Sequence, residues 1–244
     1  MKIALIGYGK MGHAIERFAL QRGHEIVCRI DAGDSGAFDS PEFASADVAI
    51  EFTMPSAAVG NFACALEKGI PVVSGTTGWT AEMPQVEKMV ADMDATLFWS
   101  SNFSIGVNLF MRVNAFLAGI MEGFPQYGVS MKEIHHIHKL DHPSGTAITL
   151  AEGIIANNSH IKGWTETGGD ETTMVIEHQR QGEVPGTHIV SWQSPVDAIT
   201  IEHRAFSRDG FALGAVVAAE WVVAHPERKG VLSMGDMLKE MGAS

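Results

Sequence analysis

The chain has 244 residues, of which 45% are hydrophobic and 19% are charged, and its net charge is −12 with histidine neutral. This length suffices for one large domain or two smaller ones, each with its own core. The acidic balance excludes the basic face that nucleic acid phosphates require, so we expect no nucleic acid partner. An anionic cofactor would have to be held by local devices such as helix N-termini.

No segment is typical of a secretion signal or a membrane span. The N-terminal apolar run is short and broken by glycines, unlike the core of a signal peptide. The longest apolar stretch, 211–224, contains Glu220 and is shorter than the roughly 20 residues that cross a bilayer. Cys28 and Cys64 are expected to be free thiols rather than a disulfide. We therefore predict a cytoplasmic protein with no membrane partner.

Strands and helices alternate over the first hundred residues. Short apolar runs predict buried strands, and apolar residues at helical spacing, followed by glycine, predict the helices between them. The expected strands cover 2–6, 25–30, 48–52, 71–74 and 96–99, and the expected helices cover 11–22, 55–68 and 83–93. Residues 32–46 are rich in Gly, Ser, Asp and Pro and are expected to be loop. This order predicts a Rossmann-type parallel sheet with right-handed crossovers.

The pattern changes near residues 104–106, where we expect a hinge. Three β-rich runs separated by short turns predict an antiparallel or mixed sheet. The expected strands are 129–138, 172–180, 187–194 and 198–206, and the expected helices are 107–121, 144–157, 211–224 and 237–241. The predicted fold class is therefore α/β, with a second α+β domain. Residues 1–104, completed by C-terminal helices within 211–244, form the first domain, and residues 105–210 form the second.

A glycine-rich turn lies between the first expected strand and helix. It matches G-x-G-x-x-G: Gly7 permits a tight turn, Gly9 lets the backbone approach a pyrophosphate, and Gly12 lets strand and helix pack closely. The helix N-terminus adds free N–H groups and partial positive charge. We predict that a nicotinamide dinucleotide binds at Gly7, Tyr8, Gly9, Lys10, Met11 and Gly12.

An acid follows the second expected strand. Asp31 stands where a carboxylate accepts hydrogen bonds from the adenosine ribose and repels a 2′-phosphate. The next residues, Ala32 and Gly33, cannot neutralise that phosphate, although Lys10 or Arg29 could compensate. We therefore predict that NADH is used at least as well as NADPH; the alternative is that Asp31 is an ordinary turn residue.

Three small polar loops follow later strands, at 53–55, 75–78 and 100–103. The carboxyl ends of parallel strands meet at one edge of a sheet, so these loops should border the same crevice. Their residues suit backbone contact with the ribose and carboxamide of the dinucleotide. Simple turns are the alternative.

Candidate catalytic and substrate-binding residues are most concentrated between residues 133 and 147. Strand alternation predicts His135 and Lys139 on one face and His136 and His138 on the other. Histidine is the usual proton carrier near neutral pH, and lysine offers a fixed positive charge or an acid.

A helix start follows directly. Pro143-Ser144-Gly145-Thr146 predicts a serine N-cap with exposed N–H groups that could hold a carboxylate, and Lys139 could add a charge-assisted bond. The segment therefore combines an anion clamp with a proton donor. Opposite a nicotinamide, this suits reduction of a carboxylated C=C or C=N substrate.

Other interpretations of this segment remain open. The histidines could be structural. His136 and His138 could bind a metal, but the adjacent lysine and the lack of an evident third ligand disfavour it, and no metal is assigned. Ser144 lacks the G-x-S-x-G elbow of a nucleophile.

Several motifs resemble the dihydrodipicolinate reductase family, and the resemblance runs nearly end to end. The order H-H-x-H-K-x-D-x-P-S-G-T is the most specific. The motifs are GYGKMG at 7–12, FTMP at 52–55, SGTTG at 74–78, SSNFSIGVN at 100–108 and EIHHIHKLDHPSGTA at 133–147.

The resemblance implies NAD(P)H-dependent formation of tetrahydrodipicolinate, by loss of water and hydride delivery to ring C4, in diaminopimelate and lysine biosynthesis. It implies a small dicarboxylate substrate, domain closure, and a homotetramer joined through the second, substrate-binding and oligomerisation domain. It implies that His135 donates or accepts a proton and that Lys139 donates one. The implied substrate residues are His136, Gly145 and Thr146, with Ser144 beside them. The implied cofactor residues are Gly7 to Gly12, Asp31, Gly75, Thr76, Thr77, Ser100, Ser101, Asn102 and Phe103.

The chain departs from the family pattern at three places. The segment after Asp31 is short, Ala32 replaces a basic residue found in many members, and Met54 stands where long forms often have arginine. The short segment implies that a strand and a helix of the long forms are missing, Ala32 bears on the preference for NADPH, and Met54 implies the loss of one ribose or phosphate contact.

Two other functions are alternatives. A different two-domain Rossmann dehydrogenase acting on a small carboxylated substrate is possible, but the sugar-oxidoreductase group carries E-K-P where this chain has residues 74–77, S-G-T-T. A non-enzymatic NAD-sensing protein would keep the glycines but would not need the His/Lys segment.

Overall fold

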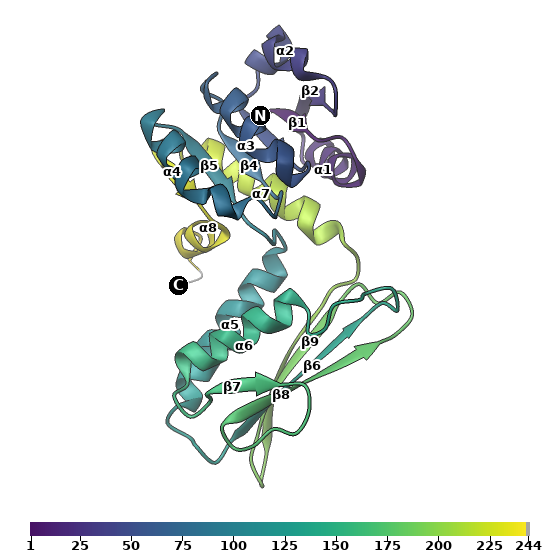
Figure 1. The fold of residues 1–244 in the computed structure, drawn as a ribbon, viewed down its shortest axis with the longest axis vertical. Helices are drawn as coiled ribbons and strands as arrows, with labels where there is room; N and C mark the ends of the chain where they lie inside the picture. Colours follow the sequence, from purple (N-terminus) through teal and green to yellow (C-terminus); the bar gives the residue numbers. More distant parts are fainter. Residues whose placement is uncertain (243–244) are drawn as a thin grey trace. The chain divides into compact units, whose positions relative to one another are not determined.

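The computed structural model describes residues 1–242 and divides the chain into two compact units. Unit 1 combines the segment from Met1 to Ile105 with the C-terminal segment from Asp209, and unit 2 comprises Gly106–Arg208. The last two residues of the expected C-terminal segment, 243 and 244, lie outside the described residues. Each unit is described by itself below (Figure 1).

Unit 1 is built on a parallel sheet in the strand order β11-β5-β4-β3-β1-β2. Every neighbouring pair is parallel, and the order reverses between β1 and β3. Ligands of such sheets bind beyond the carboxyl ends of the strands at this reversal. The strands are β1 (Lys2–Ile6), β2 (Glu25–Ile30), β3 (Val48–Glu51), β4 (Val72–Ser74), β5 (Thr96–Trp99) and β11 (Gly230–Leu232).

Helices cover both faces of this sheet because successive side chains of a strand point to opposite sides. Ile3 and Leu5 pack in a core with the helices α1, α7 and α8, whereas Ala4 and Ile6 pack in a second core with α2, α3 and α4. The helices are α1 (Lys10–Gln21), α2 (Pro41–Ala44), α3 (Pro55–Leu66), α4 (Met83–Asp92), α7 (Asp209–Ala224) and α8 (Met234–Glu240), with 3-10 turns at Ser35–Asp39 and Thr80–Glu82.

Unit 2 contains a mixed sheet in the order β10-β9-β6-β8-β7. The β6–β8 and β8–β7 pairs are parallel, and the β6–β9 and β9–β10 pairs are antiparallel. Helices α5 and α6 bury an apolar core against the sheet, with Leu150 of α6 and Trp192 of β9 fully enclosed. The elements are α5 (Ile105–Met121), β6 (Gly128–His135), α6 (Gly145–Asn157), β7 (Gly163–Thr165), β8 (Thr173–Arg180), β9 (Thr187–Gln193) and β10 (Ala198–Arg204).

The predicted α/β fold class is confirmed, and three local predictions are wrong. Strand β6 ends at His135, not at residue 138, because the chain turns back between His136 and Lys139. The C-terminal segment is not wholly helical, because Gly230–Leu232 adds strand β11 to the sheet edge. The expected loop at 32–46 contains helix α2, capped by the Ser40 side chain.

No helix among residues 1–242 is long and apolar enough to cross a membrane. Cys28 and Cys64 are both free thiols, as predicted.

Candidate active site

The glycine turn of unit 1 has the geometry that a dinucleotide requires. Gly7 has φ 93°, and a Cβ added there would lie 2.0 Å from the Phe52 carbonyl oxygen. A Cβ at Gly12 would lie 2.4 Å from the carbonyl oxygen of Gly7. Packing therefore requires both glycines. At Gly9, the N-cap of α1, an added Cβ would meet nothing within 4 Å and no side chain caps the helix, so space and N–H groups remain for an anion.

A cavity of about 440 Å³ lies beside this turn. Gly7, Gly9 and the exposed Asp31 all line it, so the structure brings these three predicted residues together. One Asp31 carboxylate oxygen accepts the N–H of Ala32 at 2.9 Å. Met54, 68% exposed, is also part of the lining.

Tyr8, Lys10 and Met11 are not among the lining residues of this cavity. The Tyr8 hydroxyl donates to Glu16, and the Arg29 guanidinium lies over the Tyr8 ring at 5.6 Å. Arg29 also pairs with Glu16, so the cation suggested to compensate for a 2′-phosphate is already engaged. Lys10 is exposed.

A buried carboxylate joins the loops that follow β3 and β4. Glu51 is inaccessible to solvent and accepts hydrogen bonds from Ser74 Oγ at 2.6 Å, from Thr76 Oγ1 at 3.1 Å and from Thr53 Oγ1. The backbone N–H of Thr53 in turn donates to Thr76 Oγ1 at 2.8 Å. The sequence analysis missed Glu51, whose signal is a single acid at the end of the apolar run V-A-I-E.

The loop after β4 is fixed at its backbone. The indole N–H groups of Trp79 and Trp99 both donate to the Thr76 carbonyl, at 2.8 and 2.9 Å. A Cβ at Gly75 would lie 2.1 Å from the Phe52 ring, so packing requires glycine there. Thr77 is exposed.

The loop after β5 has a different character. Ser100 Oγ bonds to both the N–H and the carbonyl of Asn102, whereas Ser101 is exposed. Phe103 is 2% exposed, and its ring packs against Phe52 and Phe98. Phe103 is therefore a core residue, and its carbonyl group packs against Gly214.

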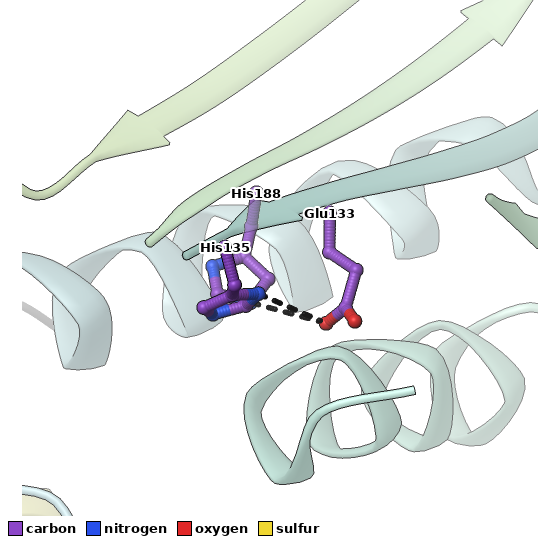
Figure 2. Close-up of side chains that lie close together, drawn as sticks. All are labelled: Glu133, His135 and His188. Atoms are coloured by element: carbon purple, nitrogen blue, oxygen red, sulfur yellow. Dashed lines mark ion pairs between the residues drawn. The ribbon is translucent and has the colours of Figure 1, made fainter. Parts of the chain in front are cut away.

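In unit 2, three titratable side chains converge on one face of the mixed sheet. Figure 2 shows Glu133 and His135 of β6 with His188 of β9, directed toward one another. Glu133 Oε2 lies 3.6 Å from His135 Nδ1 and 3.9 Å from His188 Nε2, beyond hydrogen-bond length. All three are buried, and His135 Nδ1 has no hydrogen-bond partner among residues 1–242. We call this group the buried triad.

Both carboxylate oxygens of Glu133 have donors. The backbone N–H of Ser144 donates to Oε2 at 3.0 Å, and two nitrogens of Arg180 lie 3.3 Å from Oε1. Ser144 Oγ lies 3.1 Å from His188 Nε2. The buried charge is thus compensated, as burial of a carboxylate requires.

The environment holds the triad as one carboxylate and two neutral rings near neutral pH. Burial alone raises the pKa of Glu133, but the hydrogen bonds from Ser144 and the attraction of the two histidines outweigh it, so this pKa is lowered. Burial lowers the pKa of His135, against the attraction of Glu133 and with help from the charge of Lys139. Burial lowers the pKa of His188 to about 4.

The turn after β6 carries the lysine. Lys139 Nζ lies 2.8 and 2.7 Å from the two oxygens of Asp141, and the Lys139 side chain is partly exposed. Arg180 donates to the carbonyl oxygens of Lys139 at 3.1 Å and of Asp141 at 2.7 Å. The prediction that His135 and Lys139 share a strand face is wrong, because this turn, fastened by Arg180, places Lys139 outside the strand.

The other two histidines of the segment lie apart from the triad. His136 is half-buried, its Nε2 lies 3.0 Å from an Arg208 nitrogen, and its Nδ1 has no hydrogen-bond partner in the described part of the chain. His138 is exposed and lies 3.3 Å from Glu183. Neither histidine belongs to a cluster of three possible metal ligands within residues 1–242.

Helix α6 begins as predicted, with Ser144 as its N-cap. Ser144 Oγ accepts the N–H of Ala147 at 3.2 Å. Ser144 itself is 3% exposed, and its own N–H is bonded to Glu133, so the N–H groups left for a ligand are those of the next residues. The first-turn N–H groups of the exposed Gly145 and the half-buried Thr146 are those that a helix leaves free.

Comparison with known proteins places the chain in a family. A model described as "Dihydrodipicolinate reductase, N-terminus" matches residues 1–103, and one described as "Dihydrodipicolinate reductase, C-terminus" matches residues 106–238. The chain belongs to the dihydrodipicolinate reductase family. The family, and with it the oxidoreductase class predicted from the sequence, is confirmed.

Individual relatives agree with this assignment. The chain is 46% identical to a 4-hydroxy-tetrahydrodipicolinate reductase of Christiangramia forsetii, over 99% of both chains. It is 34% identical to the protein of the same name from Archaeoglobus fulgidus, over 98% of this chain and 100% of the other. A solved dipicolinate-bound dihydrodipicolinate reductase from a Paenisporosarcina species shares the fold, with TM-score 0.76, 22% identity and coverage of 96% and 97%.

The sequence analysis gave no role to three residues in or beside the buried triad, namely Glu133, Arg180 and His188. Glu133 stood within the quoted motif but received no role, because burial was not evident from its position. His188 and Arg180 come from other strands, and the sheet register brings them opposite Glu133 and His135. No local signal in the sequence could have found these two.

Proposed function

We propose that this chain is a 4-hydroxy-tetrahydrodipicolinate reductase that uses NAD(P)H. The observation that carries the proposal is the buried triad beside a helix start with two free N–H groups and a lysine, in a chain 46% identical to an enzyme of that name. The net reaction consumes NAD(P)H and one proton, replaces a ring hydroxyl with hydride, and releases water.

Unit 1 serves as the dinucleotide-binding domain in this proposal. Gly7 and Gly12 shape the turn, the N–H groups beyond Gly9 face the pyrophosphate, and Asp31 accepts from the adenosine ribose. Glu51 holds the loops after β3 and β4 in register, as a positioning residue. Bound NAD(P)H supplies the hydride. The remaining contacts come from the glycine turn and from the loops after β4 and β5: Tyr8, Lys10, Met11, Gly75, Thr76, Thr77, Ser100, Ser101, Asn102 and Phe103.

Unit 2 serves as the substrate-binding and oligomerisation domain. The N–H groups of Gly145 and Thr146 donate hydrogen bonds to one substrate carboxylate, and His136 binds the substrate beside them. Ser144 acts as a positioning residue, since its N–H and hydroxyl already hold Glu133 and His188.

We assign proton transfer to His135 and Lys139. The lowered pKa of His135 keeps its ring neutral near pH 7, so it can accept a proton and then return it. Glu133 lies 3.6 Å from Nδ1 and stabilises the ring once it is charged. Lys139, an ammonium group already held by Asp141, is the proton donor.

The test is an assay of the purified full-length chain with freshly made 4-hydroxy-tetrahydrodipicolinate. We expect substrate-dependent loss of absorbance from NADH and from NADPH. A folded protein that binds dinucleotide but shows no substrate-dependent loss would exclude this function and favour a non-enzymatic NAD-sensing role.

The exposed Asp31 and the absence of a basic neighbour at Ala32 predict that NADH binds at least as tightly as NADPH. Replacing Ala32 with arginine should tighten NADPH binding by about 10-fold, since a charge-assisted hydrogen bond is worth roughly 1.5 kcal/mol or more. Fluorescence titration of both dinucleotides measures this change. Ala32→Met, of similar length but uncharged, is the control and should leave the NADPH Kd unchanged; equal gains in both variants would contradict the electrostatic argument.

We further propose that the protein acts in the cytoplasm, in diaminopimelate and lysine biosynthesis, as a homotetramer joined through unit 2. Ile199 of β10 is 42% exposed in the single chain, and the neighbouring Val196 is 88% exposed. Light scattering on the purified chain measures its oligomeric state.

A further inference from the structure

A second cluster of histidines and a carboxylate lies in unit 2, apart from the buried triad. His142 precedes the start of α6, Glu166 follows β7, and His178 lies in β8. Glu166 Oε2 lies 2.6 Å from His142 Nδ1 and 3.1 Å from His178 Nδ1. All three side chains are partly exposed, at 49%, 31% and 36%.

The donor atoms of this cluster lie close enough together to share one metal ion. One nitrogen from each ring and one carboxylate oxygen lie within 4.8 Å of one another. The rings of His142 and His178 are stacked, with centroids 4.3 Å apart and planes inclined by 15°, and each ring has its Nδ1 near Glu166 Oε2. Ligands that surround a zinc ion at about 2.0–2.2 Å, in tetrahedral geometry, lie within this spacing of one another.

We propose that His142, Glu166 and His178 bind a divalent transition-metal ion, with zinc as the best match. Two imidazoles and one carboxylate are a ligand set that zinc accepts, leaving a fourth position open to water or a small ligand. The nitrogen donors disfavour magnesium and calcium, which take oxygen ligands. Copper and nickel share the preference for imidazole and are expected to compete.

Charge distinguishes this cluster from the buried triad, which also brings two histidines and a glutamate together. The triad carboxylate is already paired with Arg180, a cation that would repel a metal ion. Within the part of the chain that the structure describes, Glu166 forms ion pairs with His142 and His178 and with no lysine or arginine. Among the described residues, no lysine or arginine therefore competes with a metal ion for this carboxylate.

Binding would join three segments that are distant in sequence. The ion would tie residue 142, directly before α6, to strand β8 and to the loop after β7. An ion that binds the folded state and not the unfolded one stabilises the fold, and the gain grows with the logarithm of the ratio of ion concentration to Kd. The binding itself does not depend on the proposed reductase activity.

The experiment uses the full-length protein, freed of metal by a chelator and titrated with Zn²⁺ against a chromophoric competitor. We expect one ion per chain, and a rise in Tm of about 5–10 °C at a hundredfold excess over Kd. His178→Gln should raise the Kd for Zn²⁺ and abolish the rise in Tm. The increase in Kd should exceed the roughly 10–100-fold that follows loss of a residue that only supports a metal ligand. His160→Gln, an exposed histidine of the same unit, is the matched control and should bind Zn²⁺ like the parent chain.

Two further measurements locate the ion. Co²⁺ in place of Zn²⁺ should give a visible absorption band typical of tetrahedral coordination, and the band should be lost in His178→Gln and in Glu166→Gln. The proposal is overturned if no ion binds with Kd below about 100 μM, a limit near −5.5 kcal/mol. It is also overturned if His178→Gln binds normally, or if binding is lost in His188→Gln alone, which would place the ion in the buried triad.

Discussion

Replacing His135 with glutamine should lower kcat by about 10²–10⁴-fold, while the Kd for NADH stays unchanged. His135 is 7% exposed, its ring faces Glu133 through Nδ1, and the ring is neutral near pH 7 because burial lowers its pKa. Glutamine keeps a polar group of similar reach but cannot take up a proton. Stopped-flow turnover, together with a dinucleotide titration of the same sample, separates the two effects.

The pH profile gives an independent readout of the same role. Because the proposed acceptor is the neutral ring, kcat/KM should fall as pH falls through the lowered pKa of His135, on the acid side of the usual histidine value. This acid limb should be missing from the residual activity of His135→Gln. His138→Gln is the control, since His138 is exposed and pairs with Glu183 outside the triad. Equal rates in His135→Gln and His138→Gln would remove His135 from the chemistry.

Lys139→Met should have a comparable effect on kcat, because methionine keeps the apolar length of lysine and removes the proton donor. Asp141 then loses the cation that lowers the pKa of its carboxyl. A full rate in Lys139→Met, measured in the same assay, would show that Lys139 is not the donor.

Structural features that depend on short-range sequence patterns could be predicted from the sequence. Gly7 and Gly12 are required by contacts with neighbouring backbone, and Ser144 caps α6 through its own hydroxyl. Such features depend on residues a few positions apart, or on a strand–turn–helix order that the apolar pattern makes visible. The Rossmann-type unit and the backbone shape of its glycine turn could therefore be predicted.

Features that depend on strand register could not be predicted. His188 meets Glu133 only because β6 and β9 pair antiparallel with these two residues opposite each other. Arg180 ends β8 opposite His135, and its hydrogen bonds to two carbonyl oxygens hold the turn that stops β6. The alternation of side chains expected of a strand continues through Lys139 in the sequence. Alternation alone therefore predicted a strand that continues beyond His135, where β6 ends.

Some short elements were not predicted from the sequence, for a related reason. The three residues of β11 are too few to show a period, and they become a strand only because β5 offers an unpaired edge. Glu51 and Glu133 were visible as acids, but a sequence does not say which acids are enclosed. Their burial, and hence their roles, required the packed structure.

The buried triad should make unit 2 sensitive to acid. His188 has a pKa of about 4 in the folded state, against 6.5 for an ordinary histidine. Between these values the unfolded chain binds a proton that the folded chain does not, so the free energy of unfolding falls as pH falls from 6.5 to 4. The contribution of His188 amounts to about 3 kcal/mol over this range, and about 2 kcal/mol of it is lost by pH 5.

Glu133 acts in the same direction at lower pH. Its folded-state pKa is lowered, so its contribution to stability is present above its unfolded value and is lost as pH falls through the folded one. The loss of stability that begins with His188 therefore continues below pH 4, where protonation of Glu133 also removes the charge that pairs with Arg180.

Urea unfolding of the parent chain and of His188→Gln, at pH 7 and pH 5, tests this prediction. Glutamine can keep a hydrogen bond to Ser144 Oγ but does not titrate, so the variant should lose about 2 kcal/mol less than the parent between these two pH values. His160→Gln, whose side chain is exposed, should lose as much stability as the parent. If the parent and His188→Gln show the same dependence on pH, His188 is not held neutral in the folded state, and the triad cannot be one carboxylate with two neutral rings.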